Sequence, residues 1–145
     1  MLKSIAVGAL LTIVTVYIHA VCTSWWLQRL PQYRPQETQQ RGRFFGTRIL
    51  CTTATFLLLV HILEVTVWAV AYLFLPNVDE LAGLEQAVYF STVTFASLGY
   101  GDVFIEGPPW RLLSAIQSMT GLLIFGWSTA LLYAVVQAIW TTDKE

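Results

Sequence analysis

Residues 97–102 read Ser-Leu-Gly-Tyr-Gly-Asp, and the chemistry of this segment lies in its backbone. Gly99 and Gly101 can adopt backbone angles that other residues avoid, so they allow successive carbonyl oxygens to face one side of the chain. An ordinary strand cannot do this, because its successive residues point in opposite directions. A row of carbonyl oxygens can replace the water shell of a cation. The other interpretation of the segment is an ordinary glycine-rich turn.

His61 and Glu64 form a second candidate site, because two residues three apart lie on one face of a helix. Both occur within a long apolar segment, where an ionised side chain is expensive and needs a partner. One hypothesis is a proton-sensitive switch, since histidine titrates near neutral pH. The other is a structural role, in which Glu64 is protonated or paired with His61 and hydrogen-bonds hydroxyl groups elsewhere, such as those of Ser91, Thr92 or Thr94.

A metal site at this pair is not favoured, because zinc is held by three or four ligands and no His-Glu-x-x-His pattern is present. His19, the only other histidine, is expected to be a packing residue. An intramembrane enzyme built on His61 and Glu64 is the least favoured interpretation. We therefore expect no enzymatic activity and no organic cofactor.

The elements that must position these residues are apolar helices. The chain is 56% hydrophobic and only 12% charged, outside the usual range for a soluble domain. Charged residues are absent from 4–28 and 112–142, and 49–78 contains only Glu64. Each stretch exceeds the roughly 20 residues that cross a bilayer. We expect an all-α membrane protein with three transmembrane helices, none of which carries the repeated arginines of a voltage sensor.

A fourth apolar segment, residues 84–98, is too short to cross the membrane and ends in glycines. This pattern is typical of a re-entrant helix, which enters partway and turns back. The partially negative C-terminal end of such a helix favours a cation. Acidic residues occur on both sides of the segment and within it: Asp79, Glu80, Glu85, Asp102 and Glu106. One interpretation is that they attract cations, and the other is that they simply lie in the water outside the membrane.

The distribution of charge predicts the orientation of the helices. Five arginines and one acid, Glu37, lie between the first two helices, and the positive-inside rule places such a loop in the cytoplasm. The N-terminus is then outside and the C-terminus inside. A cleaved signal peptide at 1–20 is disfavoured, because Lys3 inside would leave the arginines outside. These arginines are Arg29, Arg34, Arg41, Arg43 and Arg48.

In this arrangement the chain resembles the potassium-channel pore family, over about residues 49–137. The family signature threonine-valine-glycine-tyrosine-glycine-aspartate corresponds here to residues 97–102. The chain looks like the small bacterial type with a two-helix pore, preceded by one extra helix. The resemblance implies a filter over 97–102 in which K⁺, the transported ion, binds the carbonyl oxygens of Ser97, Leu98, Gly99 and Tyr100, with Gly101 completing the strand. It also implies that Thr94 and Asp102 support the filter and that the Leu98 and Tyr100 side chains pack behind it.

The resemblance implies a homotetramer, because one chain supplies one filter strand and cannot encircle an ion path. It further implies a bacterial inner membrane, with lipids as surroundings and without nucleic acid or a soluble substrate as partners. The expected function is passive, potassium-selective conduction. Ser97 replaces the usual threonine, so a weakly selective cation channel is an alternative, and a non-conducting accessory protein is another.

Gly121 occupies the place where the inner helix of this family often has a hinge, and Gly126 lies five residues further on another face. The sequence does not decide which of them bends and which packs. The expected division of the chain follows the family pattern. It comprises an N-terminal transmembrane helix at 1–28, a basic cytoplasmic loop at 29–48 and a pore domain at 49–140, with outer helix 49–75, pore helix 84–96, filter 97–102 and inner helix 110–140.

Overall fold

The computed structural model describes residues 1–30, 43–76, 78, 81, 83–105 and 110–140. Within these residues the chain forms helices and no strand. Three helices are long and apolar enough to cross a membrane, so the expected all-α fold with three membrane-spanning segments is confirmed. The helices are α1 (Leu2–Arg29), α3 (Arg43–Leu73), α4 (Leu84–Phe95) and α5 (Arg111–Trp140).

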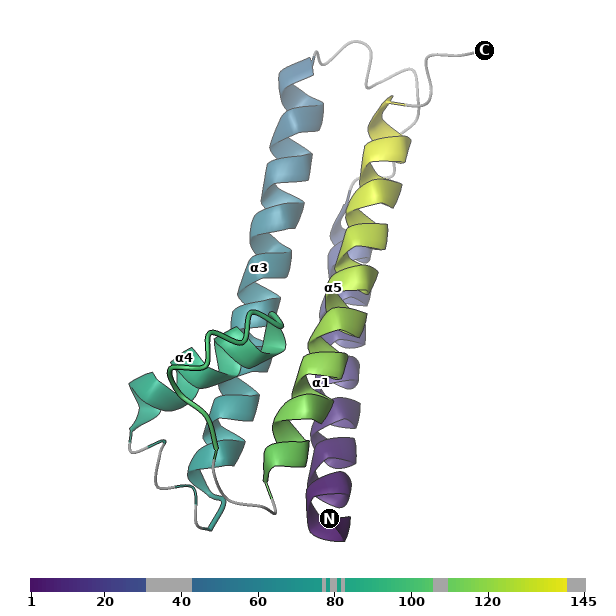
Figure 1. Cartoon of the computed structure of the whole chain (residues 1–145). Coiled ribbons are helices and arrows are strands. Elements are labelled where there is room, and N and C mark those ends of the chain that lie inside the picture. The colour runs from purple at the N-terminus through teal and green to yellow at the C-terminus, as the bar shows by residue number, and fades with distance from the viewer. Residues whose placement is uncertain (31–42, 77, 79–80, 82, 106–109, 141–145) are drawn as a thin grey trace.

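The three long helices stand side by side, with α1 and α5 parallel and α3 antiparallel to both (Figure 1). The short helix α4 crosses α3 obliquely, near the end of the bundle that holds the N-terminus, and its C-terminal end points towards α5 (Figure 1). The chain then runs back beside α4 before α5 begins. This placement holds residues 97–102 against the side of the bundle.

The helix ends differ from the expected ones in ways that local chemistry explains. α3 begins at Arg43, so residues 43–48, which were expected in the basic loop, are helical. Only Gly46 in that stretch disfavours a helix, by about 1 kcal/mol. α3 ends at Leu73 rather than 75, because the residue before Pro76 is driven out of the helical region. The loop residues Arg34, Glu37 and Arg41, and the acids Asp79, Glu80 and Glu106, lie outside the described residues.

The main core holds α4 between α3 and α5. Its largest fully buried side chains come from all three helices: Trp68, Tyr72, Phe95, Leu113 and Ile124. A smaller cluster of Ile49, Val135 and Ile139 closes the opposite end of the α3–α5 pair. α4 is thus fixed by apolar packing along its length.

α1 turns a polar stripe towards the rest of the protein. Its buried residues are Ser4, Gly8, Thr15, His19 and Thr23. Its exposed face is apolar, so its polarity is the reverse of that of a helix in a water-soluble protein. Trp68 Nε1 donates to Thr15 Oγ1 at 2.9 Å, and Trp26 Nε1 donates to Thr53 Oγ1 at 3.1 Å. Hydrogen bonds therefore fix α1 to α3.

Candidate functional site

The backbone after α4 alternates in handedness along residues 97–101. φ is positive at Ser97 (58°), Gly99 (57°) and Gly101 (80°). Ser97 is the one non-glycine residue with positive φ in the part of the chain that the structure describes, so φ is negative at Leu98 and Tyr100. Glycine adopts the left-handed region readily, whereas for serine it costs roughly 1–2 kcal/mol. The surroundings of Ser97 must therefore hold it in place.

Hydrogen bonds from α4 and α5 hold Ser97. Its backbone N–H donates to the Thr94 carbonyl at 3.0 Å, and the N–H of Leu98 donates to the Val93 carbonyl at 2.9 Å. The Ser97 hydroxyl shares a hydrogen bond of 2.8 Å with the hydroxyl of Ser118 on α5. The turn that follows α4 is thus tied both to its own helix and to the neighbouring one.

Gly121 lets α5 approach the end of α4. A Cβ atom at this position would overlap the backbone carbonyl of Phe95. Gly126, in contrast, has no atom within 4 Å of the place where its Cβ would stand. In the single chain, Gly121 is therefore the packing glycine, and α5 contacts the last turn of α4 backbone to backbone.

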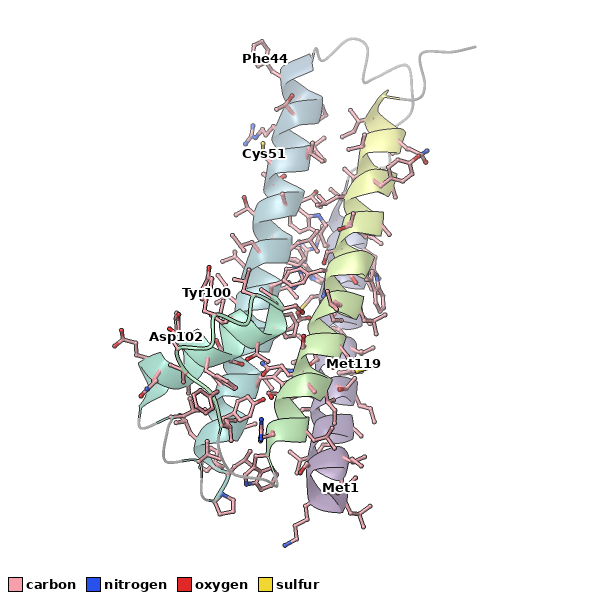
Figure 2. The ribbon with its side chains drawn as sticks, in the orientation of Figure 1. Met1, Phe44, Cys51, Tyr100, Asp102 and Met119 are labelled. Carbon is pink, nitrogen blue, oxygen red and sulfur yellow. The ribbon has the colours of Figure 1, made fainter. Side chains whose placement is uncertain are left out.

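Asp102 is anchored to α4 by Tyr89, whose hydroxyl donates to Asp102 Oδ2 at 2.6 Å. This hydrogen bond holds the pKa of the Asp102 carboxyl below its ordinary value and is the main reason that the pKa of Tyr89 is raised. Asp102 and Tyr100 project from the segment that runs back along α4 (Figure 2). The end of the segment is therefore attached to the helix that precedes it.

Apolar side chains beside the segment are uncovered in the single chain. The exposed fractions of Leu98, Tyr100 and Phe104 are 55%, 67% and 56%. A groove of about 510 Å³ lies beside the segment, and its lining includes Phe104, Ser97 and Ser118. The expected packing of Leu98 and Tyr100 behind the segment is thus not provided by their own chain.

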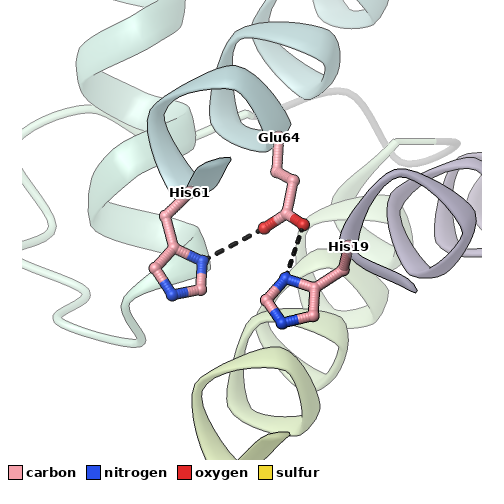
Figure 3. Close-up of side chains that lie close together, drawn as sticks. All are labelled: His19, His61 and Glu64. Carbon is pink, nitrogen blue, oxygen red and sulfur yellow. Dashed lines mark hydrogen bonds and ion pairs between the residues drawn. The ribbon is translucent and has the colours of Figure 1, made fainter. Parts of the chain in front are cut away.

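The structure confirms the expected pairing of Glu64 with His61 and shows His19, rather than a hydroxyl of α4, as its second partner. The Glu64 carboxylate contacts His19 Nδ1 through Oε1 at 2.9 Å and His61 Nδ1 through Oε2 at 3.1 Å (Figure 3). The two imidazole rings stack with their centroids 5.6 Å apart. On their far sides, Ser128 Oγ of α5 lies 3.1 Å from His61 Nε2 and 3.4 Å from His19 Nε2. His19 is therefore a member of this buried polar cluster rather than a simple packing residue.

Ser91 is not the partner of Glu64, because it belongs to a separate network that positions α4. Its hydroxyl donates to the Val65 carbonyl at 3.1 Å and accepts a hydrogen bond from Gln117 Nε2. The hydroxyl of Tyr72 donates to Gln117 Oε1 at 2.9 Å. Gln117 is fully buried, and sequence reasoning missed it. A glutamine inside an apolar helix was the signal that could have revealed it.

A family model described as "Ion channel" matches residues 58–138, more than half of the chain. The chain belongs to the ion channel family. The match takes in the C-terminal half of α3, all of α4, residues 97–102 and nearly all of α5. Together with the three spanning helices, it makes the chain an integral membrane protein of a transport family rather than of an enzyme family.

α1 lies outside the part of the chain that matches the ion channel family, although His19 and Thr15 on α1 bond residues of the matched part. No curated protein and no solved structure matched the chain.

Proposed function

We propose that this chain is the subunit of a potassium-selective channel, in which four copies surround one ion path and backbone oxygens of residues 97–101 bind dehydrated K⁺. The observation that carries the proposal is the positive φ at every second residue, Ser97, Gly99 and Gly101. Alternation in the sign of φ breaks the pattern of an ordinary strand, in which successive residues face opposite ways. It therefore allows successive carbonyl oxygens to face one side of the chain. A ladder of such oxygens replaces the hydration shell of K⁺ in channels of this kind.

The electrostatics around the segment support binding of a cation. α4 ends at Phe95, directly before the segment, and the C-terminal end of a helix carries a partial charge of about −0.5. The Ser97 hydroxyl adds one more oxygen at the inner end of the ladder. Asp102, anchored by Tyr89, places a carboxylate at its outer end. Each of these groups favours a positive ion over an anion.

Assembly of four chains follows from what one chain leaves open. A single strand of carbonyl oxygens cannot surround an ion, and a closed ring of identical subunits can. The exposed side chains of Leu98, Tyr100 and Phe104 offer apolar surface for a neighbouring copy, and Phe104 also lines the 510 Å³ groove. In the tetramer, that neighbour provides the packing behind the segment which the single chain lacks.

The orientation that fits this pore puts the N-terminus outside and the C-terminus in the cytoplasm. The five arginines at the adjoining ends of α1 and α3 and in the loop that joins them then lie on the cytoplasmic side, as the positive-inside rule requires. α4 enters from the outer face, and Asp102 lies at the outer mouth. The similarity to the small bacterial channels makes the inner membrane of a bacterium the location that we propose.

Ion flux into liposomes that contain the purified protein tests the proposal. We expect K⁺ flux well above Na⁺ flux, blocked by Ba²⁺. Gly99→Ala should abolish K⁺ flux, because alanine is strained at a φ of 57°. Gly83→Ala is the matched control, since Gly83 has a φ of −159° and nothing within 4 Å of its added Cβ. This control should conduct like the native protein.

Other outcomes would replace the proposal. Equal K⁺ and Na⁺ flux would favour the weakly selective channel, with Ser97 in place of threonine as its cause. A folded protein that passes no ion at any gradient or pH would favour the accessory protein. Unchanged K⁺ flux in Gly99→Ala would remove residues 97–101 from the ion path.

A further inference from the structure

Glu64 needs a positive charge that the basic side chains do not provide. It is completely buried at mid-helix, and in the described part of the chain its ionic contacts are with His19 and His61 alone. An isolated carboxylate in an apolar interior is strongly disfavoured. Either one added proton, held by Glu64 itself or by an imidazole, or a bound metal ion must therefore neutralise this carboxylate.

The three side chains present the ligand atoms of a transition-metal site. Both imidazoles turn Nδ1, rather than Nε2, towards the carboxylate, and the three candidate ligand atoms lie within 4.8 Å of one another. A tetrahedral Zn²⁺ with bonds of about 2.0–2.2 Å spaces its ligands by about 3.3–3.6 Å. To reach that spacing, the three atoms must move closer together and the two stacked rings must turn towards one ion. Two imidazoles and one carboxylate are a ligand set that zinc uses in proteins.

We propose that His19, His61 and Glu64 bind a divalent transition-metal ion of the Zn²⁺ class, which joins α1 to the channel domain. This site does not depend on the potassium selectivity or the assembly proposed above. It takes ligands from a helix that the family match does not include and from one that it does. Sequence spacing supplied only two of the three ligands, and the fold supplies His19.

Ser128 provides the outer hydrogen bonds that such a site requires. Metal-binding histidines usually donate their other ring N–H to an acceptor, which fixes the tautomer. With metal at both Nδ1 atoms, both Nε2 atoms carry hydrogen, and the two lone pairs of the Ser128 oxygen can accept both. Without metal, two neutral histidines that donate from Nδ1 to an ionised Glu64 would both have an unprotonated Nε2. The Ser128 hydroxyl has one proton and could donate it to only one of them. A single added proton, on Glu64 or on one imidazole, also completes the network, and the experiment must separate this metal-free state from the metal-bound one.

The structure also has room beside the ligands. His61 borders a cavity of about 200 Å³ between α3, α4 and α5, whose lining includes Phe95 and Phe125. Zinc sites with three protein ligands take a water molecule as the fourth. A bound hydroxide would also balance the charge of the ion and of Glu64. Of the three ligands only His61 lines this cavity, so the fourth ligand would have to reach the ion from the His61 side.

Cobalt substitution provides the test. The full-length protein, purified in detergent and freed of metal with a chelator, is titrated with Co²⁺. We expect one Co²⁺ per chain, with the visible absorption of a tetrahedral site and without a thiolate charge-transfer band, and displacement by Zn²⁺. His19→Gln and Glu64→Gln should lose this absorption. Ser128→Ala should keep the stoichiometry but lower the Zn²⁺ affinity by about 10–100-fold.

Thr15→Ala is the matched control. It removes the hydrogen bond from Trp68 to α1, one turn from His19, and leaves all three ligands in place. This variant should unfold at a lower temperature and still bind one Co²⁺ per chain. If a ligand variant does not fold, the native protein still decides the question. Three results would each overturn the metal site. These are failure of the native protein to bind Co²⁺ or Zn²⁺, binding of Co²⁺ by a folded His19→Gln variant as strongly as by the native protein, and a thiolate band from Cys22 or Cys51 in the spectrum. The imidazolium–carboxylate network would then explain the cluster.

Discussion

The hydrogen bond from Tyr89 to Asp102 joins α4 to the end of the proposed filter across 13 positions of sequence. It shifts the two acid–base equilibria in opposite directions, because it stabilises the ionised carboxylate and the protonated phenol. The folded-state pKa of Asp102 lies below its unfolded value. The ionised carboxylate therefore contributes fully to the stability of the fold at pH values above its ordinary pKa. This contribution is lost as the pH falls through the lowered pKa of the folded state.

We expect Tyr89→Phe to make K⁺ flux sensitive to acid at a higher pH than in the native protein. Without the phenol, the pKa of Asp102 returns towards its ordinary value of about 3.9, so the carboxylate is protonated earlier as the external pH falls. Flux into liposomes, measured from an external pH of about 7 to about 3, checks this shift. Tyr17→Phe, at an exposed position on α1, is the control and should follow the native profile. Identical profiles for the Tyr89 and Tyr17 variants would show that the anchor does not support conduction.

Residue-level chemistry was only partly predictable from the sequence. The positive φ of Gly99 and Gly101 could be predicted from the sequence, since glycine is the residue that adopts positive φ readily. The positive φ of Ser97 could not be predicted in this way, because hydrogen bonds to α4 and α5 hold this residue in the left-handed conformation. The bond between His19 and Glu64 spans 45 positions between two helices, and periodicity within a helix carries no information on how two helices align.

Among the elements, α4 depends most on its neighbours, because its 12 residues are too few for a stable isolated helix in water. α3 contributes the Val65 carbonyl, and α5 contributes Gln117 and the flat surface at Gly121. The length of α4 and its position before the glycines could be read from the sequence. Its contact with Gly121 could not, because small residues on a helix are equally compatible with bending and with packing.

Replacement of Gly121 should therefore be costly, while replacement of Gly126 should not. The Cβ of Gly121→Ala overlaps the Phe95 carbonyl, and overpacking of this kind costs about 1–3 kcal/mol. Gly126→Ala meets no atom within 4 Å and should stabilise α5 by up to about 1 kcal/mol. Thermal unfolding of the two variants in the same detergent compares them. If Gly121→Ala unfolds at the native temperature, the close contact of α5 with α4 is absent in solution.

For the whole molecule, the main feature is the apolar surface that the single chain leaves exposed. It has an apolar core between α3, α4 and α5, yet the large side chains beside residues 97–102 remain exposed. Isolated exposed apolar residues are common, but a group of them marks a candidate interaction surface. This surface is where the proposed assembly would place a neighbouring copy.

We expect four chains in each complex. Subunit counting by stepwise photobleaching of singly labelled protein in lipid nanodiscs should show complexes with four bleaching steps. Phe104→Ala, which removes a large exposed side chain beside the groove, should weaken assembly, and Leu10→Ala on the exposed face of α1 should leave it unchanged. A population of monomers or dimers in the native protein would contradict the tetramer.

The polar stripe of α1 has a consequence for the order in which the chain is made. α1 emerges from the ribosome before the helices that it contacts. The hydroxyls of Thr15 and Thr23 donate to carbonyls of their own helix, at Leu11 and His19, so they have hydrogen-bond partners in the bilayer before the other helices arrive. The His19 side chain has no such local partner among its described contacts, since Glu64 and Ser128 come 45 and 109 positions later. The first helix is therefore expected to enter the membrane with ring nitrogens that have no hydrogen-bond partner in their own helix, and these nitrogens are paired only once α3 and α5 are in place.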